Sequence, residues 1–364
     1  MKKSDMRELR KVVKNQLAVE KVYCLYVDTE NNVFYEKVRR LSEMEEAERG
    51  RHLDILTGVL PTSLGKKVFP AWLEEQNQDL IALKDMQWSD KEIFAGFRET
   101  LLENYSHLDP YYAVAARIVY DVPTKTKDKF STGESEEVYT AMLLAICPAK
   151  LSGAELGVQD ENVVELQRRW VVKRPELGFL YPTFDERGEN RNEVALFGKD
   201  PAADHLISNL FHMREQDMPA SLDEQQERFE ALLSDLDVDM EKASHFTKAI
   251  AEKAAEDKES DAIEKATIRR CAEICDIDTT DFEEYYENDV GTTKLTEAAL
   301  VNKSVTIETG DFKLSVPTEK SDLIQTRKVD GVNYILIPID GDIKVNGADT
   351  ALKPGEQRQE LSDF

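Results

Sequence analysis

The sequence predicts an α+β fold: an antiparallel-sheet N-terminal domain, a helical middle and a small β-rich C-terminal region. In the first 200 residues, apolar runs of strand length follow one another directly, which favours sequential antiparallel strands. Between about residues 201 and 302, apolar residues recur every three or four positions, as they do on helices. From Ser304 onward, short β-rich runs are separated by glycine-containing turns.

These patterns divide the chain into four expected segments. They are an α+β domain over 1–200, an acidic helical region over 201–302, a small β-rich region over 303–352 and a polar tail over 353–364. We detect no internal repeat along them.

The N-terminal segment begins with a basic amphipathic helix over Met1–Lys14. The polar run DTENN separates Lys21–Val27 from Val33–Val38 and predicts a β-hairpin. Two long strand candidates, Tyr111–Asp121 and Val138–Ile146, are joined by a polar loop and are expected to pair antiparallel. The other elements predicted in this segment are helices over Glu43–Leu60 and Ser89–Asn104, and strands over Arg168–Lys173 and Gly178–Thr183.

Helices dominate the next segment. They are predicted over His205–Glu215, Ser221–Leu236, Met240–Glu256 and Ala262–Cys275, with a short one from Thr280. Four S/T-x-x-E patterns, at Ser42, Ser89, Ser221 and Thr280, predict capping boxes at helix starts. In the C-terminal segment, Thr309-Gly310, Asp330-Gly331 and Asp340-Gly341 are hairpin-turn signals.

Charge is segregated along the chain. The formal net charge is -25. Between Ser221 and Val290 there are 22 acidic against 8 basic residues, whereas the first 70 residues carry 14 basic against 11 acidic ones. The acidic surface favours solubility and repels nucleic acid and anionic lipid at long range.

The sequence marks no catalytic residue and predicts neither a metal nor a cofactor. The segment GVLPTSLGKK has the wrong glycine spacing for a phosphate-binding loop. The acidic run from Asp235 lacks the glycine and glutamate that a calcium loop needs at its sixth and twelfth positions. Cys271 and Cys275 would supply only half of a structural zinc site.

The densest mixture of basic and aromatic residues lies between Arg168 and Arg187. Alternating cations and aromatic rings on strands can neutralise and stack on nucleic acid. The commoner arrangement, which we favour here, has Trp170, Phe179 and Tyr181 facing the core and the charges facing water. The candidate contacts for an anionic partner are Arg168, Arg169, Lys173, Arg174 and Arg187, together with Lys2, Lys3, Arg7, Arg10 and Lys11 of the first helix.

The order of local sequences resembles a bacterial family known as domain of unknown function 4317. The similarity is carried by MRELRKVV, YCLYVDTENNVFYE, PTSLGKK, AICPAKL, GFLYPTFDERG and KVDGVNYILIPIDGDIKVNG, which follow in order along nearly the whole chain. This resemblance implies a cytoplasmic protein of Gram-positive-type bacteria, without an assigned activity or catalytic residues.

The region from about Ser89 to Gly347 is also similar to bacterial nucleoid-associated proteins. The shared segments are VYTAMLLAIC, FEALLSDLDVD and IEKATIRRCAEICDIDTTDFEEYYE, followed by a small β end. This second resemblance implies association with the nucleoid, directly or through other proteins.

We therefore predict a non-enzymatic, cytoplasmic binding or structural protein, with nucleoid association as its most specific form. A cytoplasmic location fits four cysteines without a disulfide pattern and a basic start that no signal-length apolar run follows. The expected partner is a protein or a second copy of the chain, with weak or indirect contact to nucleic acid and none to membranes. One alternative is a hydrolase-like enzyme with its site near residues 178–187. Another is an acidic docking protein or mimic that binds a basic partner through Asp235, Asp237 and Asp239.

Overall fold

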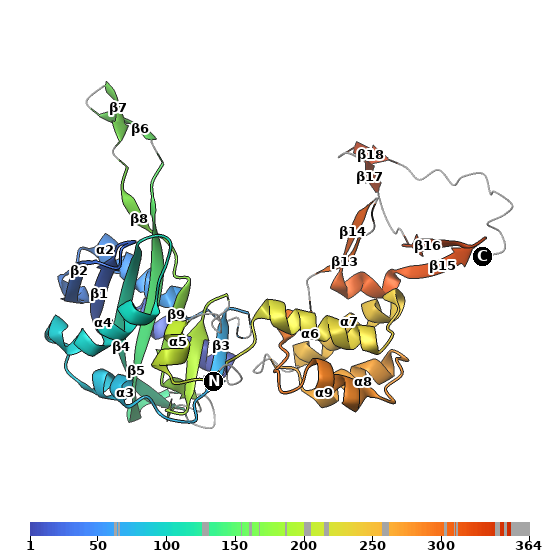
Figure 1. Cartoon of the computed structure of the whole chain (residues 1–364), viewed down its shortest axis with the longest axis horizontal. Coiled ribbons are helices and arrows are strands. Elements are labelled where there is room, and N and C mark those ends of the chain that lie inside the picture. Colours follow the sequence, from blue (N-terminus) through green and yellow to red (C-terminus); the bar gives the residue numbers. More distant parts are fainter. Residues whose placement is uncertain are drawn as a thin grey trace.

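The computed structural model describes most of the chain. The described residues are 1–61, 64, 66–125, 131–153, 155–159, 162–166, 168–185, 188–199, 205–214, 218–256, 262–301, 304–308, 310, 312–338, 343–345 and 348–350. Strands and helices alternate irregularly through the first half, helices follow, and short hairpins end the described chain (Figure 1).

An antiparallel sheet forms the centre of the N-terminal part. Its strand order is β2 (Val33–Arg40), β1 (Val19–Val27), β4 (Tyr111–Lys125), β5 (Ser131–Leu151), β9 (Leu177–Tyr181), β12 (Glu193–Phe197) and β3 (Val68–Trp72). Every neighbouring pair along this order runs antiparallel. The fold class predicted from the sequence is therefore confirmed.

Both faces of this sheet are buried. One face packs against α1 (Lys3–Lys14) and α2 (Glu46–Gly58). The other packs against α3 (Gln78–Asp85), the turn η2 (Lys91–Phe94) and α4 (Ala95–Asn104). Because alternate residues of a strand point to opposite faces, a strand between two helical layers must be apolar at nearly every position. The runs YYAVAARIVY and AMLLAIC meet that requirement.

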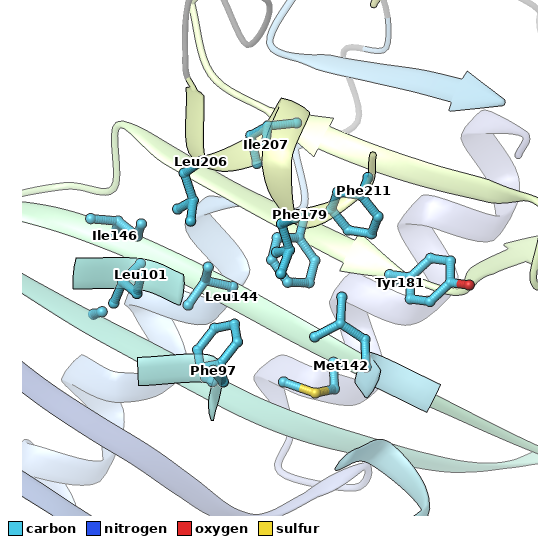
Figure 2. Packing of buried hydrophobic residues seen from close by; sticks show 14 of the residues in the cluster. Phe97, Leu101, Met142, Leu144, Ile146, Phe179, Tyr181, Leu206, Ile207 and Phe211 are labelled. Carbon is cyan, nitrogen blue, oxygen red and sulfur yellow. The ribbon is translucent and has the colours of Figure 1, made fainter. Parts of the chain in front are cut away.

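Helix α5 (His205–Leu210) belongs to the packing of this sheet. Leu206, Ile207 and Phe211 are buried in the same cluster as the sheet residues Leu144 and Phe179, and the ring of Phe211 meets that of Phe179 edge to face at 5.1 Å (Figure 2). The division at residue 200 remains a prediction about domains, but in space this helix covers the sheet.

A separate apolar cluster holds the helical region together. It unites α6 (Leu222–Asp235), α7 (Met240–Glu256), α8 (Lys265–Ile274), α9 (Phe282–Asp289) and α10 (Glu297–Leu300). The turn η5 (Thr318–Leu323) packs on α7, where the Ser321 hydroxyl donates to the Ser244 carbonyl at 3.1 Å. The C-terminal strands pair as β13 (Ser304–Glu308) with β14 (Lys313–Pro317), β15 (Gln325–Val329) with β16 (Val332–Leu336), and β17 (Ile343–Val345) with β18 (Ala348–Thr350).

The predicted turn at Asp330-Gly331 is confirmed, since both residues have positive φ, 49° and 82°, between paired strands. The turn at Asp340-Gly341 lies outside the described residues. Sequence reasoning missed β3, α3 and β12, and it extended α5 too far along the chain.

Three of the four predicted capping boxes are wrong. Helix α2 begins after Glu45, because residues Leu41–Glu43 form a tight turn of their own. At Ser89 the neighbouring Asp90 accepts the capping bond instead, and Thr280 donates to Asp278. At the fourth, only half of the box is present: Ser221 caps α6 by accepting from the backbone N–H of Glu224 at 3.1 Å, whereas the Glu224 carboxylate accepts from Arg228 at 2.8 Å.

Glycine at position 178 is required by the close approach of β9 to β5. A Cβ atom there would lie 2.2 Å from the Leu144 carbonyl oxygen, which is backbone and cannot move aside. We predict that Gly178→Ala lowers the free energy of unfolding by about 1–3 kcal/mol, the usual cost of overpacking. Urea unfolding followed by circular dichroism measures it. Gly96→Ala is the matched control: its Cβ would meet open space on α4, so stability should be unchanged or raised.

Candidate functional site

A two-stranded ribbon leaves the sheet where β5 ends. Ala149–Leu151 of β5 pair with β8 (Trp170–Val172), and the hairpin of β6 (Glu155–Gln159) and β7 (Asn162–Leu166) continues beyond them. We call residues 149–174 the β8 ribbon; it projects from the top of the sheet in Figure 1.

The base of the ribbon is exposed on both faces. Trp170, Leu151 and Val172 have exposed fractions of 50%, 45% and 37%. Residues paired across an antiparallel ladder share a face, so Trp170 lies beside its partner Leu151, and Val172 lies on the same side. These three side chains form an apolar strip that the remainder of the described chain leaves open to solvent.

Cations surround this strip. Successive side chains of a strand point to opposite faces, so Arg168 and Arg174 share the face of Trp170. The other face carries Lys150, Arg169 and Lys173. All five are exposed. The sequence from 152 to 167 carries acids and no cation, so the positive charge is confined to the base.

The structure therefore corrects the expected position of Trp170 and confirms the burial expected of Phe179 and Tyr181. Phe179 and Tyr181 are buried, as we expected of core aromatics, but Trp170 does not face the core. Four of the predicted basic contacts, Arg168, Arg169, Lys173 and Arg174, are brought together at the ribbon base. Arg187 lies outside the described residues.

The basic residues of α1 form a separate group. Arg10 donates to the carbonyls of Thr57 and Leu60 at 2.7 and 3.0 Å and so holds the end of α2. Lys3 lies 3.7 Å from Glu297 of α10. Lys2, Arg7 and Lys11 are exposed. In Figure 1 the N-terminus lies below the sheet, whereas β6 and β7 project above it, so α1 does not extend the ribbon surface.

Near residues 178–187, where an enzyme site was the alternative, three described carboxylates lie beside cations of the same chain; Glu186 is outside the described residues. The amino group of Met1 lies 3.0 Å from Glu193 and 3.8 Å from Asp185. The buried Lys84 lies 2.6 Å from Glu189. These contacts join the start of the chain and α3 to β12 and to the hairpin that pairs Thr183–Asp185 with Gly188–Asn190.

The three aspartates of the proposed acidic docking face, Asp235, Asp237 and Asp239, are all exposed. Asp239 also has a local role, because its carboxylate accepts from the Lys242 backbone N–H at 2.8 Å at the start of α7. Asp235 lies near Asp289, whose pKa is raised by burial and further by the charge of Asp235. Part of the acid in this region is therefore tied to helix structure.

The family follows from comparison with known sequences. Residues 1–348 match the model of a family described as a domain of unknown function, DUF4317. The chain belongs to this family. No curated protein and no solved structure matches it. These comparisons give no support to the resemblance with nucleoid-associated proteins.

Two searches of the described part of this DUF4317 chain gave negative results. There, no helix is both long and apolar enough to span a membrane. Within the same residues, no group of three or more His, Cys, Asp or Glu side chains is placed to hold a metal ion.

A buried cysteine–histidine pair was not anticipated from the sequence. Cys24 Sγ lies 3.8 Å from His52 Nε2, which in turn lies 3.0 Å from the Tyr112 hydroxyl. Such a pair can form a nucleophile when the cysteine is ionised. Here desolvation raises the pKa of Cys24 to about 11, so the thiol stays protonated at neutral pH. Only the spatial meeting of β1, β4 and α2 reveals this cluster.

We predict that the Cys24 thiol makes stability fall at high pH. Its folded pKa lies above the unfolded value, so its contribution is complete below about pH 8.5 and is lost as pH rises toward 11. Two pKa units correspond to roughly 3 kcal/mol. Urea unfolding at a series of pH values measures the slope. The Cys24→Ala variant should show a shallower decline, and an identical slope in both proteins contradicts the assignment.

In the acidic region we predict different effects on the free energy of unfolding at two nearby positions, Asp239 and Asp235. Asp239→Ala removes a helix cap and should lower the free energy of unfolding by about 1 kcal/mol. Asp235→Asn relieves repulsion of the Asp289 carboxylate and should leave stability unchanged or higher. Thermal and urea unfolding test both. A loss for Asp235→Asn contradicts the repulsion between Asp235 and Asp289, and the absence of a loss for Asp239→Ala contradicts the helix cap.

Proposed function

We propose that the protein is a non-enzymatic binding protein whose contact element is the base of the β8 ribbon. The observation that carries this proposal is the half-exposed Trp170, flanked by apolar neighbours and five exposed cations on an element that projects from the sheet. Exposed apolar patches with polar rims typically mark binding sites in soluble proteins. A location in the cytoplasm is part of the same proposal and fits the free state of all four cysteines.

The ligand that suits this surface is single-stranded nucleic acid. Its phosphates can pair with the cations, and a base can stack on the Trp170 ring. The resemblance of residues 89–347 to nucleoid-associated proteins, carried by the segments quoted above, would fit this ligand class but finds no support in the comparisons, so the ribbon surface alone supports the proposal. The net charge of -25 opposes long-range attraction, but ions screen charges beyond about 10 Å at 0.1 M salt. Local contacts at the ribbon would therefore decide binding.

The test is binding of a labelled oligothymidylate of about 16 nucleotides, measured by fluorescence anisotropy at low and moderate salt. We expect binding that weakens as salt rises, because each paired phosphate releases counterions. Trp170→Ala should cost about 1–3 kcal/mol of binding free energy through lost stacking. The triple change Arg168→Gln, Arg169→Gln and Lys173→Gln should weaken binding and flatten its salt dependence.

The matched control changes three exposed cations of α1, Lys2→Gln, Arg7→Gln and Lys11→Gln, and should leave binding unchanged. Absence of binding at low salt contradicts the proposal. So does binding that is lost with the α1 variant and kept with the ribbon variants. If polyglutamate binds as tightly as the oligothymidylate, and Trp170→Ala does not weaken its binding, the ribbon binds polyanions in general rather than nucleic acid.

A further inference from the structure

A pocket of about 600 Å³ opens on the sheet face that carries α3 and α4, beside the end of α1. It is lined by residues of β1, of β4 and of the loop that follows α3. Its wall includes the cationic side chains of Lys21, Arg40 and Arg117 and the ring of Trp88. Pockets of this size are typical of sites for small molecules.

Arg117 is the unusual residue of this pocket. It stands in the apolar run of β4, opposite Met142 of β5. Its Nε atom is buried and has no hydrogen-bond partner among the described residues. Burying a donor of a charged group without a partner costs free energy. A residue placed at such a cost is explained if an anion in the pocket completes its hydrogen bonds.

The other cations leave the pocket positive. Lys21 is half-buried and forms no ion pair with the described residues. Glu20 also lines the pocket and lies 3.6 Å from Arg40, which is 3.8 Å from Glu43 as well, so three cations face one carboxylate in the lining. This local excess of positive charge is notable in a chain with a net charge of -25.

The opposite wall is apolar and rigid. The Trp88 indole N–H donates to the Leu83 carbonyl at 2.9 Å, and the side chain is only 2% exposed, so just a small apolar part of it reaches the pocket. Phe94 meets that ring edge to face at 4.7 Å and fixes it. Leu17, 70% exposed, lies on the rim.

The rim also carries backbone strain. Gln16 has a φ of 57° and follows the last turn of α1, where Leu17 N–H donates to the Val12 carbonyl. Glycine is the usual residue at this left-handed position after a helix. Gln16 is among the residues that line the pocket, so this strained position lies at the proposed site.

We propose that this pocket binds a small organic anion. Its phosphate or carboxylate group pairs with Arg117 and Lys21, and its apolar or planar part lies against Trp88 and Leu17. The site is independent of the β8 ribbon, because the pocket and the ribbon base share no side chain. Failure of either proposal therefore leaves the other standing.

The full chain with Trp72→Phe and Trp170→Phe keeps Trp88 as its single tryptophan and so reports on the pocket. Phenyl phosphate, benzoate and inorganic phosphate are the probes. We expect a saturable change in Trp88 emission and a rise in Tm with phenyl phosphate or benzoate, whichever head group the cations prefer. Inorganic phosphate should bind more weakly, because it lacks the apolar part.

Arg117→Met in the same background should weaken binding of the preferred probe by about tenfold to a hundredfold, the usual effect of losing a charged hydrogen bond. Without ligand it should raise Tm, because the unpaired buried donor is gone. A residue with a purely structural role would lower Tm when removed. Arg7→Met, an exposed arginine outside the pocket, is the matched control and should change neither quantity.

If Arg117→Met does not fold, Lys21→Gln is measured in its place. This variant should also weaken binding of the preferred probe. The absence of a saturable response to phenyl phosphate and benzoate overturns the proposal. Unchanged affinity in Arg117→Met, or in Lys21→Gln where that variant is the one tested, overturns it as well. Inorganic phosphate binding as tightly as the aromatic probes contradicts the role of the apolar wall.

Discussion

Burial of both faces of β4 and β5 is the constraint on which the rest of the structure depends. Each face needs its own helical layer, so α1 and α2 must cover one side while α3, α4 and α5 cover the other. The apolar runs of the two strands also fix their register, because a shift by one residue would exchange the two faces. Both proposed sites arise where this burial ends: the ribbon where β5 leaves the sheet, and the Arg117 pocket where β4 passes the loop after α3.

Electrostatics acts on two scales in this protein. The helical region supplies a large negative field, yet part of its acid is local structure, as at Asp239 on α7. Ion pairs such as Lys3 with Glu297, and Lys199 with Asp223 at 3.0 Å, join the sheet-forming part to these acidic helices. Among the described residues, the ribbon cations and two of the pocket cations, Lys21 and Arg117, form no ion pair, whereas Arg40 lies near Glu20 and Glu43. Net charge therefore describes solubility, whereas recognition would depend on these local groups.

Much of the fold is predictable from sequence because period and length identify long buried strands and helices. β3 was missed because VFPAW is short and contains proline, a residue that argues against a strand. The sequence places Trp170 in the core because WVV resembles a buried strand. No residue pattern near it indicates that β8 pairs with the end of β5 outside the main sheet. Capping boxes failed where Asp90 or Asp278 competed for the same bonds. Arg117 is recognisable in the sequence as a single charge inside the apolar run YYAVAARIVY. That its Nε atom has no partner among the described residues can be seen only in the structure.

The central claim is that this DUF4317 chain makes contact through its ribbon rather than through its acidic helices or α1. Photo-crosslinking of a bromodeoxyuridine oligonucleotide to the intact protein, followed by peptide mapping, tests it most directly. The account predicts crosslinks in the peptide that contains Trp170, removed by excess unlabelled strand. Crosslinks confined to α1 or to residues 221–290 would contradict it.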